Sequence, residues 1–247
     1  YRVGRARGAV IDTALARAFV RHDLVAPPYD SGPDTSPDHR AIWLAGAQAT
    51  PQFDSHQAAA YLARAQRVLA GQFELLDGRV VELGMPPAWH RNPADGSVWP
   101  PPGKNTLALQ RADAADVRYL LELHRHHELV WLAQAWRISS DARYLIAAAR
   151  WLSDWLDACP PGVGAGWSSA LEVGLRLTNW SIAWQLLGTS LDHVDPTLRQ
   201  RWSDHVYLHA RFIQHNRSRH SSANNHLVGE LVGLYLASLT WPHWRAL

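Results

Sequence analysis

Residues 168–188 read SSALEVGLRLTNWSIAWQLLG and form a clear helical segment of the sequence. The polar residues Glu172, Arg176 and Asn179 recur at i, i+4 and i+7, so they share one face of a helix that is otherwise apolar. One interpretation is an ordinary Glu–Arg pair within the helix, worth about 0.3–0.5 kcal/mol. The other is a polar rim that faces an opening between helices.

Comparable helical patterns lie on both sides of this segment, and short turn-like connections separate them. Helices of about 20 residues with short loops indicate antiparallel helical hairpins. We therefore predict a mainly α fold, an incomplete α/α toroid built of such hairpins. Four further helices are expected, over about 114–137, 142–158, 196–216 and 222–240. The second follows a cap at 139–141, and the third has Pro196 at its first helical position.

The N-terminal half is less regular. A helix is expected from about His56 to Phe73, and two shorter ones over 7–26 and 36–49. Proline- and glycine-rich turns over 74–106 predict an irregular insertion with short extended pieces at 74–76 and 79–83. We expect an N-terminal helical segment over 1–50 and a toroid domain over 51–247. That domain is expected to be truncated, because a toroid needs more hairpins to close.

Composition excludes several classes of protein. The only cysteine, Cys159, rules out a disulfide framework, and a net charge of +2 is small for a nucleic-acid-binding protein. No apolar run approaches the roughly 18 residues of a membrane span, so no membrane insertion is expected. The first residues, 1–5, contain neither an initiator methionine nor a signal-type apolar stretch, which predicts a trimmed chain.

The segment from Arg217 to Glu230 reads RSRHSSANNHLVGE, a basic, hydroxyl-rich loop that enters a helix. The N-terminus of a helix presents free N–H groups and a positive dipole, which suit an anion. Asn225 and His226 offer hydrogen-bond donors there, and Glu230 is spaced to orient the imidazole of His226. The plainer interpretation is a helix capped by Ser222 or Asn224 beside a buried histidine.

Three histidines lie close together at His124, His126 and His127, next to Glu122 and Arg125. On a helix these rings point in different directions and lack the spacing of a helical zinc motif, so we expect no metal site. His205 and His209 share a face but have no evident third ligand. No nucleophile elbow, phosphate loop or dinucleotide fingerprint is present, and no cofactor is expected.

Taken together, these segments resemble the N-terminal helical domain of the heparinase II/III-like polysaccharide lyases, over roughly residues 55–240. The resemblance depends on the order and spacing of several motifs: 71–76, Trp89, 99–100, 116–118, 122–125, 132–136, 166–176 and 224–226.

The resemblance implies an enzyme that cleaves uronic-acid-containing glycans, such as glycosaminoglycans or alginate, by β-elimination. Asn225 and His226 match the residues that neutralise the uronate carboxylate. The family's tyrosine acid and second histidine would lie beyond Leu247, as would a β-sandwich domain that partners the toroid; Tyr207, Tyr235 and His220 are candidates within the chain. A periplasmic or secreted location is expected. The expected substrate-binding residues are Glu122, Arg125, Trp167, Glu172, Arg176, Arg219, His220 and Asn224.

Two other functions stay open at this point. One is a helical module that binds an anionic polysaccharide without cleaving it. The other is a helical-barrel glycoside hydrolase, which would need a pair of carboxylates across a cleft.

Overall fold

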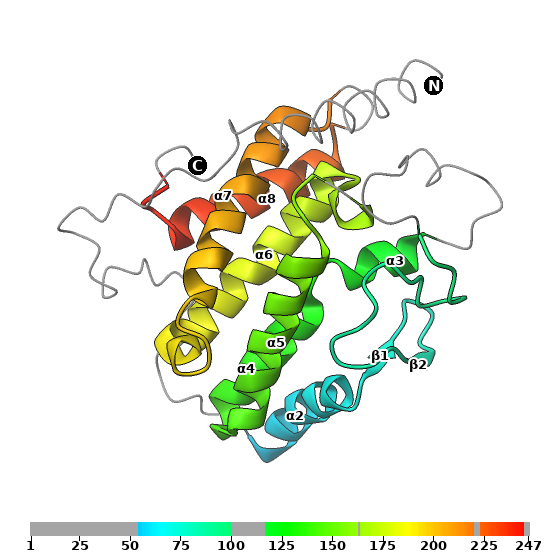
Figure 1. Cartoon of the computed structure of the whole chain (residues 1–247), viewed down its shortest axis with the longest axis vertical. Helices are drawn as coiled ribbons and strands as arrows, with labels where there is room; N and C mark the ends of the chain where they lie inside the picture. The colour runs from blue at the N-terminus through cyan, green and yellow to red at the C-terminus, as the bar shows by residue number, and fades with distance from the viewer. Residues whose placement is uncertain (1–53, 100–116, 163, 220–222, 245–247) are drawn as a thin grey trace.

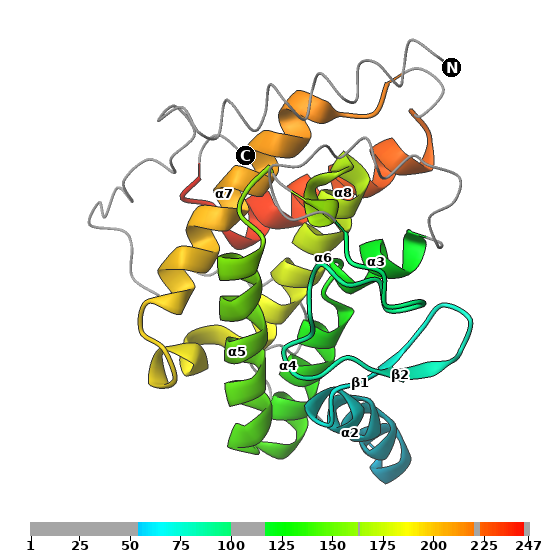
Figure 2. The same cartoon turned by 45° about the vertical axis from the view of Figure 1, so that its right-hand side comes forward.

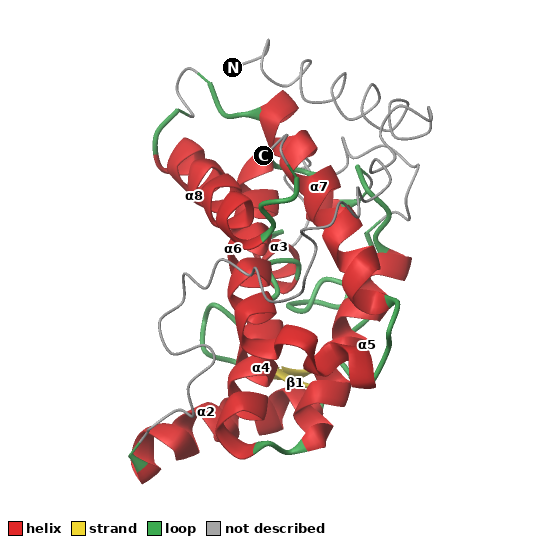
Figure 3. Ribbon diagram, turned by 90° about the vertical axis from the view of Figure 1, so that its left-hand side faces the viewer, coloured by secondary structure: helices red, strands yellow, loops and turns green. Residues whose placement is uncertain are grey.

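A computed structural model of the chain describes residues 54–99, 117–162, 164–219 and 223–244. Helices dominate these ranges, with one small two-stranded sheet (Figures 1 and 3), which confirms the predicted mainly α fold. No helix in these ranges is long and apolar enough to cross a membrane. The predicted N-terminal helical segment over 1–50, including its helices over 7–26 and 36–49, lies outside the described residues.

Several helices begin where a short polar side chain caps the first turn. Asp54, Asp141 and Ser169 each accept a hydrogen bond from a backbone N–H two or three residues ahead, as good N-caps do. The helices are α2 (Ser55–Leu69), α3 (Arg118–Leu123), α4 (His127–Ser139), α5 (Ala142–Ala158), α6 (Ala170–Leu187), α7 (Leu198–Asn216) and α8 (Asn225–Thr240), with short 3₁₀ turns η3 (Ala165–Trp167) and η4 (Gly188–His193).

The helices form two rows. In the first row α2, α4, α6 and α8 are successive neighbours, and in the second row α5 packs on α4 while α7 packs on α6 and α8 (Figures 1 and 2). Within the first row α6 and α8 run in the same direction, because Leu171 meets Gly229 near their starts and Trp184 meets Trp241 near their ends. Helix α7 runs opposite to α6, since Arg176 bonds His209 and Trp184 contacts Trp202.

Tryptophan rings fill the space between the two rows. Trp180 of α6 meets Trp155 of α5 edge-on, with ring centroids 5.5 Å apart, and Trp202 of α7 at 6.0 Å. Edge-to-face packing of this kind adds roughly 0.5–1.5 kcal/mol per pair beyond the burial of apolar area. All three rings have no measurable exposure, so most of the tryptophan excess in this sequence serves the core.

Helices α6 and α8 make backbone contact through three glycines. A Cβ added at Gly233 would lie 2.4 Å from the carbonyl oxygen of Gly174, and one added at Gly174 would lie 2.8 Å from that of Gly229. A Cβ at Gly229 would meet side-chain ends instead, those of Leu171 at 2.6 Å and Leu175 at 3.9 Å. The N-terminal halves of the two helices therefore lie side by side, at a separation that backbone contact determines.

The helix predicted over 114–137 is wrong in one respect: the described part is broken into α3 and α4. His126 adopts a left-handed conformation, φ 63°, and the helix restarts at His127. The side chain of His126 is fully buried and its Nδ1 accepts a hydrogen bond from Trp180 Nε1 at 2.9 Å. Tertiary contact with the tryptophan core thus stabilises a backbone conformation that local propensity disfavours.

The helix predicted to reach Phe73 ends at Leu69, and Phe73 lies in a strand instead. Strands β1 (Gln72–Glu74) and β2 (Val80–Glu82) pair antiparallel beside α2 (Figure 2), close to the extended pieces expected from the sequence. The chain reverses at Gly71, φ 74°, where a Cβ would lie 2.8 Å from the Cα of Gly84. Glycine is needed at this point for both the conformation and the close approach.

Two predicted helix starts are also shifted. Helix α7 begins at Leu198 rather than at Pro196, because Asp195 accepts hydrogen bonds from the N–H and hydroxyl of Thr197 and holds a turn before the helix. Helix α8 begins at Asn225 with Asn224 as its N-cap, later than the predicted start at Ser222. Ser222 itself lies outside the described residues.

The glycine contact between α6 and α8 gives a stability prediction. Glycine in a helix normally costs up to about 1 kcal/mol relative to alanine, so Gly→Ala inside a helix should stabilise. At Gly233 we expect the reverse, a loss of about 1–3 kcal/mol from overpacking against the α6 backbone. Urea unfolding would measure this loss in the free energy of unfolding. Gly229→Ala is the milder control, because the Leu171 side chain can shift. Equal or greater stability of Gly233→Ala would contradict the contact.

Candidate active site

The Asn225–His226 pair lies on the first turn of α8 and is accessible. Asn224 and Asn225 are exposed and His226 is half-buried. The Asn224 side chain caps the helix by accepting from the backbone N–H of His226, at a long 3.5 Å. No acidic residue lies in this first turn, so no side-chain charge there offsets the positive end of the helix dipole. An anion can therefore meet backbone and side-chain donors at this point.

Glu230 anchors the segment before α8 and does not bond His226. Its carboxylate is fully buried and accepts hydrogen bonds from the backbone N–H of Ser218 at 2.8 Å and from its hydroxyl at 2.5 Å. The expectation that Glu230 orients the imidazole of His226 is therefore wrong, because both of its oxygens bind Ser218. Arg219, expected to bind substrate, is exposed beside this anchor, and His220 lies outside the described residues.

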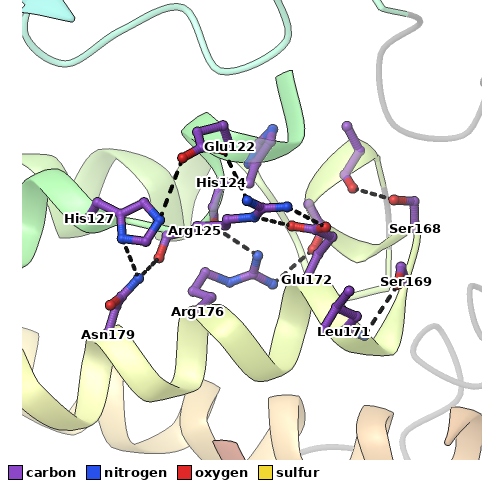
Figure 4. A network of polar contacts seen from close by, with 12 residues as sticks. Glu122, His124, Arg125, His127, Ser168, Ser169, Leu171, Glu172, Arg176 and Asn179 are labelled. Atoms are coloured by element: carbon purple, nitrogen blue, oxygen red, sulfur yellow. Dashed lines mark hydrogen bonds and ion pairs between the residues drawn. The ribbon is translucent and has the colours of Figure 1, made fainter. Parts of the chain in front are cut away.

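Glu122, Arg125 and Glu172 form one ion-pair network (Figure 4). Arg125 makes a two-pronged contact with Glu172, Nε to Oε2 at 2.7 Å and Nη2 to Oε1 at 3.0 Å, and its Nη1 donates to Glu122 at 2.9 Å. The hydrogen bond with Glu172 raises the pKa of Arg125 above its ordinary value. Glu172 thus pairs across to the α3–α4 junction and not with Arg176 on its own helix.

Asn179 and His127 extend this network along the surface. The Asn179 amide donates to the carbonyl oxygen of Arg125 at 2.8 Å and lies 3.2 Å from His127 Nδ1. His127 Nε2 lies 3.7 Å from a Glu122 oxygen, and partial burial lowers the pKa of His127. Five polar side chains from α3, the α3–α4 junction, α4 and α6 are therefore connected (Figure 4).

Arg176 supports this network from beneath and does not reach the surface. Its guanidinium donates to His209 Nε2 at 2.9 Å, to the His124 carbonyl oxygen at 3.0 Å and to the Gly166 carbonyl oxygen at 2.9 Å. The rings of Trp155 and Trp167 lie 4.5 and 5.4 Å from its central carbon. Full burial lowers the pKa of Arg176 to about 9.

Burial separates the predicted substrate-binding residues into two groups. Trp167 is 1% exposed and Arg176 0%, so neither contacts solvent in this structure and both hold other residues in place. Glu172 is 4% exposed, and both of its carboxylate oxygens accept hydrogen bonds from Arg125. Arg125 and Glu122 are partly exposed and are the network's surface members. Contact with substrate stays a prediction for all of them.

The buried histidines at the α3–α4 junction are structural neighbours of the tryptophan core. Trp155 Nε1 donates to His124 Nδ1 at 3.0 Å, as Trp180 Nε1 does to His126 Nδ1. These bonds place the proton of each neutral imidazole on Nε2. Among the described residues no group of three or more histidine, cysteine or acidic side chains is arranged to hold a metal ion.

Sequence reasoning gave little weight to His127 and none to Trp131 of α4 and Arg64 of α2. His127 was considered only as a metal ligand, although its position in α4 links Glu122 to Asn179. The Arg64 guanidinium lies 5.8 Å from the Trp131 ring centroid, and the His127 ring lies 6.5 Å away at 22°. The i, i+4 spacing of His127 and Trp131 indicates that these two side chains share a helix face. No sequence pattern indicates that Arg64 of α2 joins them.

The profile of the heparinase II/III N-terminus matches residues 50–246 of the chain. The chain belongs to this family. A search of curated proteins finds no match. A solved structure of a heparinase III with methylated lysines is similar over 94% of this chain and 32% of its own, with a TM-score of 0.54 and 18% identity. At that identity the likeness supports the fold alone. The chain thus spans about a third of the length of this solved heparinase III.

The buried histidines of this heparinase-family domain make its folding sensitive to acid. Burial, with Arg176 nearby, lowers the pKa of His124 to about 3 and holds those of His126 and His209 well below the ordinary value; burial and Arg201 lower that of His205 to about 4. The unfolded histidines take up protons below pH ~6.5 while the folded ones do not.

We therefore expect the stabilising contribution of these histidines to be complete above pH ~6.5 and to fall by up to about 1.4 kcal/mol per histidine per pH unit below it. Urea unfolding followed by tryptophan fluorescence between pH ~8 and ~4.5 measures the slope. His209→Gln should flatten it, whereas His56→Gln on the exposed face of α2 should not. A free energy of unfolding that does not change over this range would contradict the burial of these rings.

Glu128 gives the opposite dependence. Burial raises the pKa of this carboxyl, 7% exposed, to about 8, and its Oε2 has no hydrogen-bond partner. The unfolded carboxyl ionises above pH ~4.5 and the folded one does not, so its contribution to stability falls as pH rises from ~4.5 to ~8. We expect Glu128→Gln to stabilise by about 2 kcal/mol at pH ~8 and to have little effect at pH ~5. Glu82→Gln, on an exposed strand, is the control, and a gain independent of pH would refute the assignment.

Proposed function

We propose that the chain is the N-terminal helical part of a polysaccharide lyase that cleaves uronic-acid-containing glycans by β-elimination. The single observation that carries the proposal is the position of Asn225 and His226. In a family member, the two residues that match the carboxylate-neutralising motif lie accessible on a helix start that has no acidic residue of its own.

The chemistry explains why these residue types are needed. In β-elimination a base removes the C5 proton of the uronate, the electron pair forms the C4–C5 double bond, and the C4–O bond to the leaving sugar breaks with protonation of that oxygen. A uronate carboxylate already carries a negative charge, which opposes further charge at C5. Hydrogen bonds from Asn225 and His226 to the carboxylate would take up charge as it develops, which lowers the barrier.

The two rows of helices support a finer proposal about architecture. Helices α4, α6 and α8 of the first row alternate along the chain with α5 and α7 of the second row, and α6 and α8 run parallel, which is the pattern of an α/α toroid. We propose that the first row is the inner layer of an incomplete toroid over 51–247, and that further helices and a β-sandwich domain complete the protein. The residues that act as base and acid would come from that portion.

Exposed apolar residues on α8 are consistent with such a neighbour. Val228, Leu231, Val232 and Tyr235 are 42–63% exposed and follow the i, i+3, i+4, i+7 spacing of one helix face. Helix α6 already covers the opposite glycine face of α8. A further helix packed on this stripe would continue the first row. The proposed substrate also implies a protein located in the periplasm or outside the cell.

The decisive test is Asn225→Ala in the complete protein. We expect kcat to fall about 10²–10³-fold, the usual cost of removing one donor to a developing oxyanion, while KM changes little. Turnover is followed by the ultraviolet absorbance of the unsaturated uronate on alginate, heparan sulfate and hyaluronan. Gln200→Ala, which removes an exposed amide on α7, is the matched control.

The same assay separates the competing functions. Full activity of Asn225→Ala would overturn its role. A glycoside hydrolase would shorten the glycan without producing the absorbance, and a binding module would hold the glycan without shortening it.

A further inference from the structure

Trp131 differs from most tryptophans of this chain in keeping part of its indole at the surface. Of the twelve tryptophans within the described ranges, ten are buried, and only Trp131 and Trp136 are partly exposed. The partly exposed positions of α4 include 127, 131, 134 and 138, which share one helix face. Trp131 therefore presents an aromatic surface on the face of α4 that also carries His127.

Two side chains from different helices flank this indole. The guanidinium of Arg64 on α2 lies over the ring, 5.8 Å from its centroid, and the His127 ring is nearly parallel to it at 6.5 Å. Arg64 is exposed and pairs with no carboxylate among the described residues. One turn further along α2, Arg67 does pair, with Glu74 at 3.1 Å. The indole thus positions a guanidinium whose charge is directed to solvent.

This cluster is continuous with the candidate active site. His127 Nδ1 lies 3.2 Å from the Asn179 amide, and Asn179 donates to Arg125 of the ion-pair network. The residues therefore extend from α2 through α4 to α6, and α6 packs on α8, the helix that begins at Asn225. Two ordinary interhelix spacings, roughly 16–20 Å, separate α4 from α8. That span corresponds to several sugar units of a glycan.

We infer that Trp131, Arg64 and His127 form an accessory subsite that binds an acidic sugar several units away from the residue that is cleaved. The exposed part of the indole would pack on the apolar C–H face of a pyranose. Arg64 would pair with a uronate carboxylate or an O-sulfate, and His127 would hydrogen-bond a hydroxyl. This subsite rests on the proposed function and specifies it, because it requires a polyanionic glycan longer than the reacting disaccharide.

Binding measurements on matched variants test the subsite. Calorimetry compares hexasaccharides of alginate and heparan sulfate with neutral cellohexaose. We expect Arg64→Ala and Trp131→Ala to weaken binding of the acidic hexasaccharides about tenfold, and Trp131→Phe to retain most of the affinity. Arg67→Ala, which removes the same charge from the same helix, should leave affinity unchanged. Arg64 is exposed, so its replacement leaves the fold intact.

Kinetics in the complete protein separate failure of the subsite from failure of the proposed function. On long glycans Arg64→Ala should raise KM about tenfold with kcat unchanged, whereas on disaccharides it should change neither. Wild-type affinity and KM in Arg64→Ala would overturn the subsite and leave the lyase proposal standing. A tenfold weaker Arg64→Ala beside a fully active Asn225→Ala would uphold the subsite and overturn the assigned chemistry. No binding of any acidic hexasaccharide to the wild type would overturn both.

Discussion

The buried guanidinium of Arg176 is the interaction on which the rest of the structure depends. A charge without solvent contact is costly unless hydrogen bonds compensate for the lost water. Here its Nε, Nη1 and Nη2 donate to His209, to the carbonyl of His124 and to the carbonyl of Gly166, between two indole faces. These bonds tie α6 to α7, to η3 and to the α3–α4 junction. The position of Arg125, one residue after His124, and thus of its pairing with Glu172, follows from them.

Local signals predicted much of the fold and not its irregular points. Helices α5 and α6 lie within a few residues of their predicted bounds because Asp141 and Ser169 are caps that can be read from the sequence. The break at His126 could not be read in the same way. Its left-handed backbone is stabilised by an indole donor from Trp180, 54 residues away along the chain, so the cause is tertiary.

The candidate site shows the same division. A local motif singles out Asn225 and His226 in the sequence, and the structure has both residues in the first turn of α8. The polar line on α6 was also predicted, but its members separate in depth: Arg176 is in the core while Asn179 borders the surface network. A sequence pattern gives the face of a helix, whereas the depth of each residue depends on what packs over it. The approach of Arg64 to Trp131 has no local signal, because α2 and α4 are far apart in sequence.

The glycine contact between α6 and α8 limits how this part of the chain can change shape. Because backbone meets backbone at Gly174, Gly229 and Gly233, the separation of these two helices is already at its minimum and changes in side-chain volume elsewhere do not adjust it. Backbone contact therefore fixes the spacing between the N-terminal half of α6, which carries Glu172, and that of α8, which begins at Asn225. Under the proposed function, a change in glycan specificity would come from replacing individual surface side chains, one sugar position at a time, and not from widening the space between these two helices.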